Sequence, residues 1–325
     1  MSGMRTSAIG SLPGTDLGAG TRLALESVSV PWLPEFPARG PWAGMVGRAL
    51  GLLDGLGAEL AAGEWKLSGL PGVDQRRARA ALRDDLDVLE ENAQGLTGPL
   101  KVAVTGPWTL AASVFRPLGG RVLGDRGARR DLAQSLASGV RDLIGDVERR
   151  LPGVEVLLQV DEPALPSVLT GAVPTEGGYF RHRSVDRPEA VDLLRELGGH
   201  VLHCCAPGLD AASAIGEHGA GFTGVSLDQD LMTRADWDTI APLLEDGREL
   251  WLGCAPTASG EPLGADALTR RVLGALRPLE LGPVLLDRVV LTPACGMAGW
   301  TPRAVSTLLR ALGTTAERMG DELSR

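Results

Sequence analysis

Short apolar runs alternate with longer amphipathic segments along the whole chain. Most of the runs are nearly continuous in apolar residues, which is typical of strands buried on both faces of a parallel sheet. The predicted strands are Arg5–Gly10, Ser27–Leu33, Lys101–Thr105, Val154–Val160, His200–Cys204, Gly224–Leu227, Glu249–Gly253 and Arg288–Leu291.

Helix-length patterns lie between these strands. In Val73–Ala93, the longest clear pattern, Leu82, Leu86 and Leu89 recur at helical spacing. The other predicted helices are Ala128–Leu151, Pro188–Leu197, Arg234–Leu244, Ala265–Leu276 and Pro302–Met319. Strands that alternate with helices over 325 residues favour an α/β protein with one (β/α)8 TIM barrel spanning residues 1–325. A doubly wound sheet is the alternative, and the expected long loops are Leu12–Leu25 and Pro163–Pro188.

Composition narrows the classes of function. The net charge of −9, without any basic run interleaved with aromatic residues, argues against nucleic-acid binding and against attraction to an anionic membrane. The apolar runs are too short to cross a bilayer and the first residues lack the apolar core of a secretory signal, so we expect a cytoplasmic protein. Four cysteines suit metal binding or catalysis better than a disulfide framework. Lysine occurs only at Lys66 and Lys101, which we interpret as compositional bias.

Soft metal ligands stand at the ends of two predicted strands. His203 and Cys205 are two residues apart, so on an extended backbone their side chains point to the same side. Cys295 follows another apolar run. Because the carboxyl ends of barrel strands meet at one mouth, these side chains predict a tetrahedral zinc (Zn2+) site. Asp228 is the expected fourth ligand, and Cys254 is the alternative to it.

The competing interpretation is a hydrogen-bonded core histidine beside cysteines that pack as small apolar residues. Cys204 is expected to pack in this way, because strand side chains alternate. Zinc is favoured over iron or copper because mixed sulfur and nitrogen ligands suit it and no iron–sulfur or haem motif is present. Thiolate ligands would leave a zinc-bound substrate thiolate nucleophilic, which favours alkyl transfer to a thiol over hydrolysis.

Motifs that follow one another in barrel order over nearly the whole chain resemble the C-terminal catalytic barrel of cobalamin-independent methionine synthase. They are Ile9–Pro13, Thr105–Thr109, Gln159–Leu165, His203–Cys205, Val225–Asp228 and Pro293–Gly296. The resemblance implies a zinc-dependent methyltransferase that transfers a methyl group to the thiol of homocysteine, giving methionine. It implies His203, Cys205 and Cys295 as zinc ligands, with Asp228 where the family has a glutamate ligand.

The resemblance also assigns the amino-acid side of the site. The implied substrate-binding residues are Ile9, Gly10, Ser11, Glu35 and Asp161. The first three match a loop that holds the amino-acid end of homocysteine, and Asp161 matches a carboxylate that pairs with its ammonium group. Asp161 and Glu162 are the candidate catalytic carboxylates, and the alternative role for them is a helix or turn cap.

The methyl-donor side departs from the family pattern. The long-form enzyme has a second, N-terminal barrel that has no counterpart in these residues. A tryptophan expected soon after Thr105–Pro107 and a histidine expected within Trp251–Thr257 are both missing. The expected donor is therefore methyltetrahydrofolate or a methylated corrinoid, free or on a corrinoid protein. The rival functions are methylation of another thiol such as coenzyme M, a decarboxylase of the uroporphyrinogen type, and a degenerate zinc-binding protein without activity.

Overall fold

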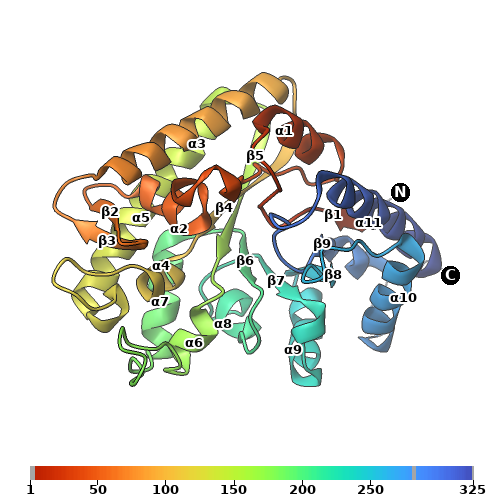
Figure 1. Cartoon of the computed structure of the whole chain (residues 1–325). Coiled ribbons are helices and arrows are strands. Elements are labelled where there is room, and N and C mark those ends of the chain that lie inside the picture. The colour runs from red at the N-terminus through yellow and green to blue at the C-terminus, as the bar shows by residue number, and fades with distance from the viewer. Residues whose placement is uncertain (1–3, 280–282, 324–325) are drawn as a thin grey trace.

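An all-parallel sheet of seven strands forms the centre of the computed structural model and curls into a half-barrel (Figure 1). In spatial order its strands are β1 (Arg5–Thr6), β9 (Val289–Pro293), β8 (Glu249–Ala255), β7 (Gly224–Asp228), β6 (Val201–Cys204), β5 (Val154–Asp161) and β4 (Gly98–Thr105). The structure describes residues 4–279 and 283–323. Because the strands are parallel, all their carboxyl ends lie at one edge of the sheet, where enzymes of this architecture build their sites.

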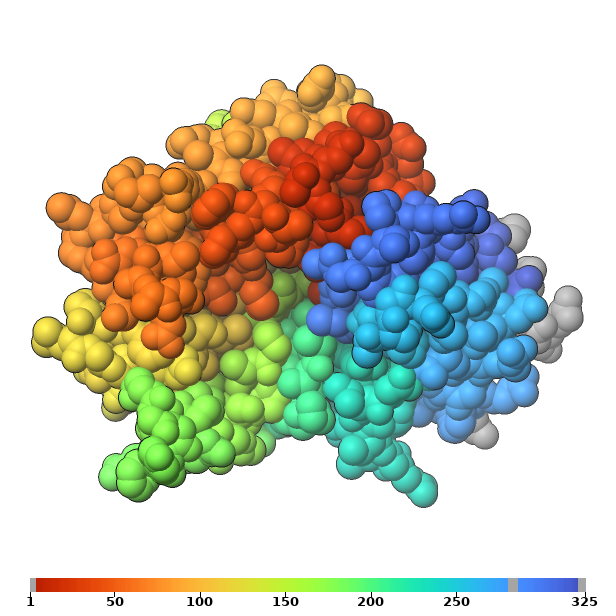
Figure 2. Space-filling view, viewed as in Figure 1, coloured from red at the N-terminus to blue at the C-terminus, as the bar shows by residue number. Residues whose placement is uncertain are grey.

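Helices surround the sheet, and several of them connect one parallel strand to the next (Figure 1). The main ones are α3 (Val73–Asn92), α5 (Arg126–Arg150), α7 (Arg187–Leu197), α8 (Ala211–Ile215), α9 (Arg234–Glu245), α10 (Ala265–Leu276) and α11 (Pro302–Leu323). Every helix predicted from the sequence is present, and α10 has both ends where the pattern placed them. Figure 2 shows the first and last parts of the chain side by side, where α11 packs on β1.

The second predicted strand is the main difference between expectation and structure. Ser27–Leu33 forms no regular strand. Residues 30–35 instead make isolated bridges, Trp32 to Lys101 in β4 and Glu35 to Ser11 after β1. Pro31 and Pro34 provide the physical reason, because proline has no N–H with which to donate to a ladder. The segment therefore lies between the two edge strands of the sheet, β1 and β4, and makes backbone hydrogen bonds to each of them at isolated residues.

Several short elements are not predicted by the sequence pattern. The expected loop Leu12–Leu25 contains most of α1 (Leu17–Glu26), whose first turn is capped by Asp16. The hairpin of β2 (Gly57–Ala61) and β3 (Glu64–Ser68) lies outside the parallel sheet. The remaining short helices are α2 (Met45–Leu52), α4 (Pro107–Ser113) and α6 (Leu165–Leu169). Within the described ranges, no helix is long and apolar enough to cross a membrane.

Candidate metal centre and substrate cavity

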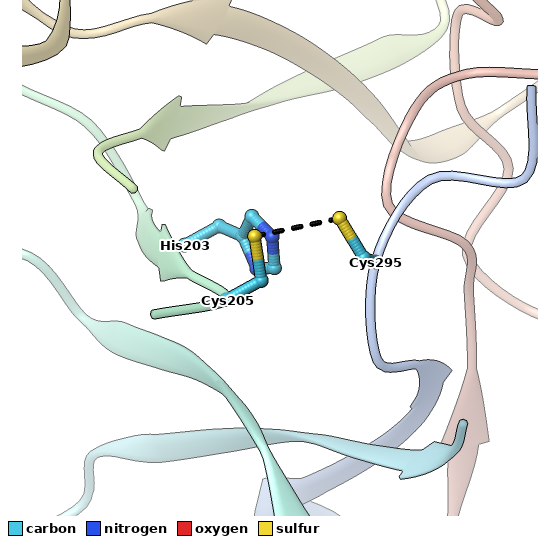
Figure 3. A group of neighbouring side chains, drawn as sticks. All are labelled: His203, Cys205 and Cys295. Carbon is cyan, nitrogen blue, oxygen red and sulfur yellow. Dashed lines mark hydrogen bonds between the residues drawn. The ribbon is translucent and has the colours of Figure 1, made fainter. Parts of the chain in front are cut away.

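Three potential metal ligands converge at the carboxyl edge of the sheet (Figure 3). His203 lies in β6, Cys205 follows that strand, and Cys295 follows β9. Their ligand atoms all lie within 4.8 Å of one another, and the two sulfurs are 3.4 Å apart. In a tetrahedral zinc site with Zn–S bonds of about 2.3 Å, two sulfurs lie about 3.8 Å apart. The arrangement is therefore close to that of three zinc ligands.

The orientation of His203 supports this interpretation. Its Nδ1 lies 2.9 Å from the hydroxyl oxygen of Ser226 in β7. Its Nε2 is buried and has no hydrogen-bond partner. Buried polar atoms are almost always partnered, so this nitrogen indicates a missing ligand. A proton on Nδ1, donated to Ser226, leaves a lone pair on Nε2, which is the form that binds metals. The residues present therefore fit a metal ion.

The two thiols differ in acidity because they share a hydrogen bond. The hydrogen bond to Cys205 lowers the pKa of Cys295. The same hydrogen bond, together with burial, raises the pKa of Cys205. The pair therefore loses a first proton readily and retains the second. Binding of a divalent cation would favour loss of the second proton as well.

The structure does not bring Asp228 or Cys254 into this group. The Asp228 carboxylate accepts a hydrogen bond from the Asp230 backbone N–H at 3.0 Å and caps the short helix η4 (Gln229–Leu231). The Cys254 side chain is fully buried, with its sulfur 3.7 Å from the carbonyl oxygen of Thr292. Cys204 packs in the apolar core, as strand alternation predicts. Three protein ligands that leave one position open are typical of a catalytic zinc site.

A cavity of about 340 Å³ adjoins the three ligands. Its lining includes the five residues that the sequence assigns to substrate binding: Ile9, Gly10, Ser11, Glu35 and Asp161. The loop after Cys295 closes on this cavity, where a Cβ atom on Gly296 would lie only 2.1 Å from the Ser11 hydroxyl oxygen. Glycine at this position therefore allows the loop that carries Cys295 to approach the loop that carries Ser11.

Two carboxylates face the cavity, and burial weakens the acidity of both. Burial raises the pKa of Glu35 to about 7, although the Arg48 guanidinium, 3.5 Å from its carboxylate, opposes the rise. Burial also raises the pKa of Asp161, against the lowering effect of its hydrogen bond from Gln159. Gln159 donates a hydrogen bond to the Asp161 carboxylate at 2.7 Å. Because none of the described arginines and lysines lines this cavity, it is suited to bind a cationic group.

Glu162 is placed differently from its neighbour and does not line the cavity. Its two oxygens accept hydrogen bonds from the backbone N–H groups of Trp108 and Thr109, at 2.8 and 2.7 Å, and from the Thr109 hydroxyl at 2.6 Å. A Cβ atom on Gly106 would lie 2.3 Å from this carboxylate. Glu162 therefore caps α4 from a distance in sequence, which is a structural role and differs from the catalytic role expected for it.

Replacing Glu162 by alanine is expected to destabilise the protein by about 3 kcal/mol, because buried N–H groups at the start of α4 would lose their acceptor. Urea unfolding should show a lower midpoint with an unchanged slope. Asp125→Ala is the matched control, because Asp125 caps α5 at the surface by accepting from Ala128. Its expected cost is about 1 kcal/mol. An equal cost for both variants would contradict the buried capping role.

The fold can be compared directly with solved structures. No protein-family model and no curated protein matches the chain. The B12-independent methionine synthase from Shewanella sp. W3-18-1, solved in complex with selenomethionine, superposes with a TM-score of 0.65. The match covers 99% of this chain and 99% of that chain at 15% sequence identity. At this identity the likeness establishes the fold alone: along nearly its whole length, the chain shares the architecture of this solved structure, in agreement with the fold that the resemblance implies.

Proposed function

We propose that this protein is a zinc-dependent methyltransferase that transfers a methyl group to the thiol of homocysteine and so forms methionine. The observation that carries the proposal is the convergence of His203, Cys205 and Cys295 beside a cavity lined by two carboxylates. The shared fold supports the same reaction type. A thiol that carries an amino group would use both parts of this site: its sulfur would bind the metal, and its ammonium group would pair with the carboxylates.

We further propose that the chain forms one (β/α)8 domain over residues 1–325, in which residues 30–35 occupy the eighth strand position. The Leu33 N–H donates to the Lys101 carbonyl at 2.8 Å on one side, and the Val30 N–H donates to the Thr6 carbonyl at 2.9 Å on the other. These bonds connect the segment to both edge strands of the sheet. A closed barrel would place the cavity at its mouth, where the sites of such folds are built.

The chemistry follows from the ligand set. A zinc ion held by Cys205, Cys295 and Nε2 of His203 would keep one coordination position open for a substrate thiol. A thiol bound there would lose its proton, and its sulfur would stay nucleophilic. The hydrogen bond between Nδ1 of His203 and Ser226 would leave Nε2 free to bind the metal. Asp161 and Glu35 would pair with the substrate ammonium group, and the loop Ile9–Ser11 would hold the rest of its amino-acid end. Together these contacts would orient the sulfur toward the incoming methyl group.

The lining of the cavity favours homocysteine over the rival substrates. Coenzyme M carries a sulfonate and no ammonium group, so Glu35 and Asp161 would repel it. Uroporphyrinogen carries many carboxylates, and the lining offers them neither arginine nor lysine. The proposed donor is methyltetrahydrofolate or a methylated corrinoid, and side-by-side assays with methyltetrahydrofolate and methylcobalamin would assign it. A zinc site that bound homocysteine without turning over any donor would instead support the degenerate, non-catalytic protein.

The decisive experiment is a titration of the purified zinc protein with homocysteine, followed at the metal by X-ray absorption. We expect one additional sulfur ligand to appear at a stoichiometry of one per zinc, because the three protein ligands leave one position open. Coenzyme M serves as the control and should need a much higher concentration to change the metal spectrum, because it has no ammonium group. A protein that retains no zinc, or zinc whose ligand shell does not change with homocysteine, would contradict the proposal.

A further inference from the structure

A fully buried lysine lies beneath the carboxylates of the cavity. Lys101 is in β4, and its ammonium nitrogen donates to the Ile9 carbonyl oxygen at 2.6 Å and to the side-chain oxygen of Gln159. It also lies 5.8 Å from the ring centre of Trp251. Burial of an ammonium group is costly unless each donor finds a partner. These contacts stabilise the buried charge of Lys101. It is one of two lysines in a chain whose other basic side chains are mostly arginines.

Lys101 helps to determine which way the Gln159 amide faces. Gln159 is fully buried in β5, and its oxygen is engaged by the ammonium group of Lys101. A lysine can only donate, so the amide nitrogen must point away from it. That nitrogen donates to the Asp161 carboxylate at 2.7 Å and to the Ile9 carbonyl at 3.1 Å. A reversed amide would turn its oxygen toward these two acceptors and its nitrogen toward the ammonium group, so Lys101 reinforces the orientation that Asp161 and Ile9 also favour.

This hydrogen-bond chain ends at the groups that would receive the substrate ammonium. Asp161 and Ile9 both line the cavity, whereas Lys101 and Gln159 lie behind them and do not. Asp161 and Glu35 are also the two acids that raise the pKa of Lys101 against the effect of burial, which lowers it to about 7. The positive charge of Lys101 therefore interacts with the negative charges of both carboxylates.

We propose that Lys101 and Gln159 form a positioning pair that orients Asp161 and the Ile9 carbonyl toward the α-amino group of the substrate. The inference rests on the proposed function and deepens it, because it assigns selection of the amino group to residues that never touch the substrate. The thiol end of the site, which depends on His203, Cys205 and Cys295, should be independent of this pair.

Calorimetric titration of the zinc protein with two thiols separates these roles. Homocysteine and 4-mercaptobutyrate have the same thiol and carboxylate, but only homocysteine has the amino group. For Lys101→Met, we expect the Kd of homocysteine to rise about tenfold to a hundredfold, as when a hydrogen bond to a charged group is lost. The Kd of 4-mercaptobutyrate should change by less than about threefold. Lys66→Met, which replaces the other lysine of the chain, is the matched control and should change neither value.

A second pair of variants keeps the proposal falsifiable if Lys101→Met folds poorly. Gln159→Leu removes the amide and should reproduce the selective loss of homocysteine binding. Combining Gln159→Leu with Asp161→Asn should cost much less than the two single changes together, because both act through one carboxylate. Equal weakening of both thiols, or additive effects, would overturn the positioning role while leaving the proposed function intact. Failure of the wild-type zinc protein to bind either thiol would instead overturn the proposed function, and this inference with it.

Discussion

Replacing Cys295 by alanine is expected to remove nearly all bound zinc and to lower methyl transfer to homocysteine by more than about a thousandfold. Loss of a group that merely orients a metal ligand already costs about tenfold to a hundredfold, and loss of the ligand itself costs more. The remaining pair, His203 and Cys205, cannot close a tetrahedral site from one strand end. Metal analysis of the purified variant and an assay of methionine formation with each candidate donor would measure both effects.

Cys254→Ala is the control for this experiment. Cys254 is also a cysteine at the end of a strand, and it is the alternative fourth ligand suggested by the sequence, but its sulfur lies in the core. We expect this variant to retain zinc at the wild-type level and to lose only some stability, since a buried sulfur has been removed. Full zinc occupancy in Cys295→Ala, or loss of zinc in Cys254→Ala, would show that the ligand set proposed here is wrong.

Asp161→Asn is expected to raise the KM for homocysteine about a hundredfold while leaving the zinc content unchanged. Asparagine is nearly isosteric and its oxygen can still accept from Gln159, so the main change is loss of the negative charge that would face the substrate ammonium. Removing one partner of a buried charge pair typically costs about 2–5 kcal/mol, and about 2.7 kcal/mol corresponds to a hundredfold change in binding. Steady-state kinetics over a wide range of homocysteine concentrations would give KM and kcat separately.

The matched control is Asp228→Asn, because Asp228 also ends a strand of the sheet but caps η4 instead of lining the cavity. We expect wild-type zinc content and a wild-type KM from it. A large drop in zinc content would restore Asp228 as the fourth ligand implied by the sequence. A KM unaffected by Asp161→Asn would remove this carboxylate from the amino-acid site and leave Glu35 as the remaining anionic partner.

The strand alternation of the sequence was sufficient to predict how the metal ligands group together. His203 and Cys205 point to one side because they are two residues apart, and Cys204 between them packs in the core. Cys295 joins them because parallel strands end at a common edge. The same rule also brings residues of the first loop to the cavity. For residues at strand ends, the alternation of side chains and the common edge of the parallel strands were therefore enough to predict which residues come together.

The sequence could not separate caps from cavity residues. Glu162 and Asp228 each lie at the carboxyl end of a strand, as Asp161 does, yet each meets backbone N–H groups of a short helix. Such contacts depend on the exact path of the chain over a few residues. Lys101 was missed for a related reason, since its partners Ile9 and Gln159 are distant in sequence. The available signal was one lysine inside an apolar strand of an arginine-rich chain.

The two sulfurs of the candidate metal centre are separated by 90 residues in sequence. No short peptide from this chain could therefore reproduce the site, and β6 through β9 must align before the sulfurs meet. In zinc fingers the metal drives folding, and the peptides are unfolded without it. Here the order should be reversed: the chain would fold first and acquire its metal late, so that chelation would leave a folded and reloadable apoprotein.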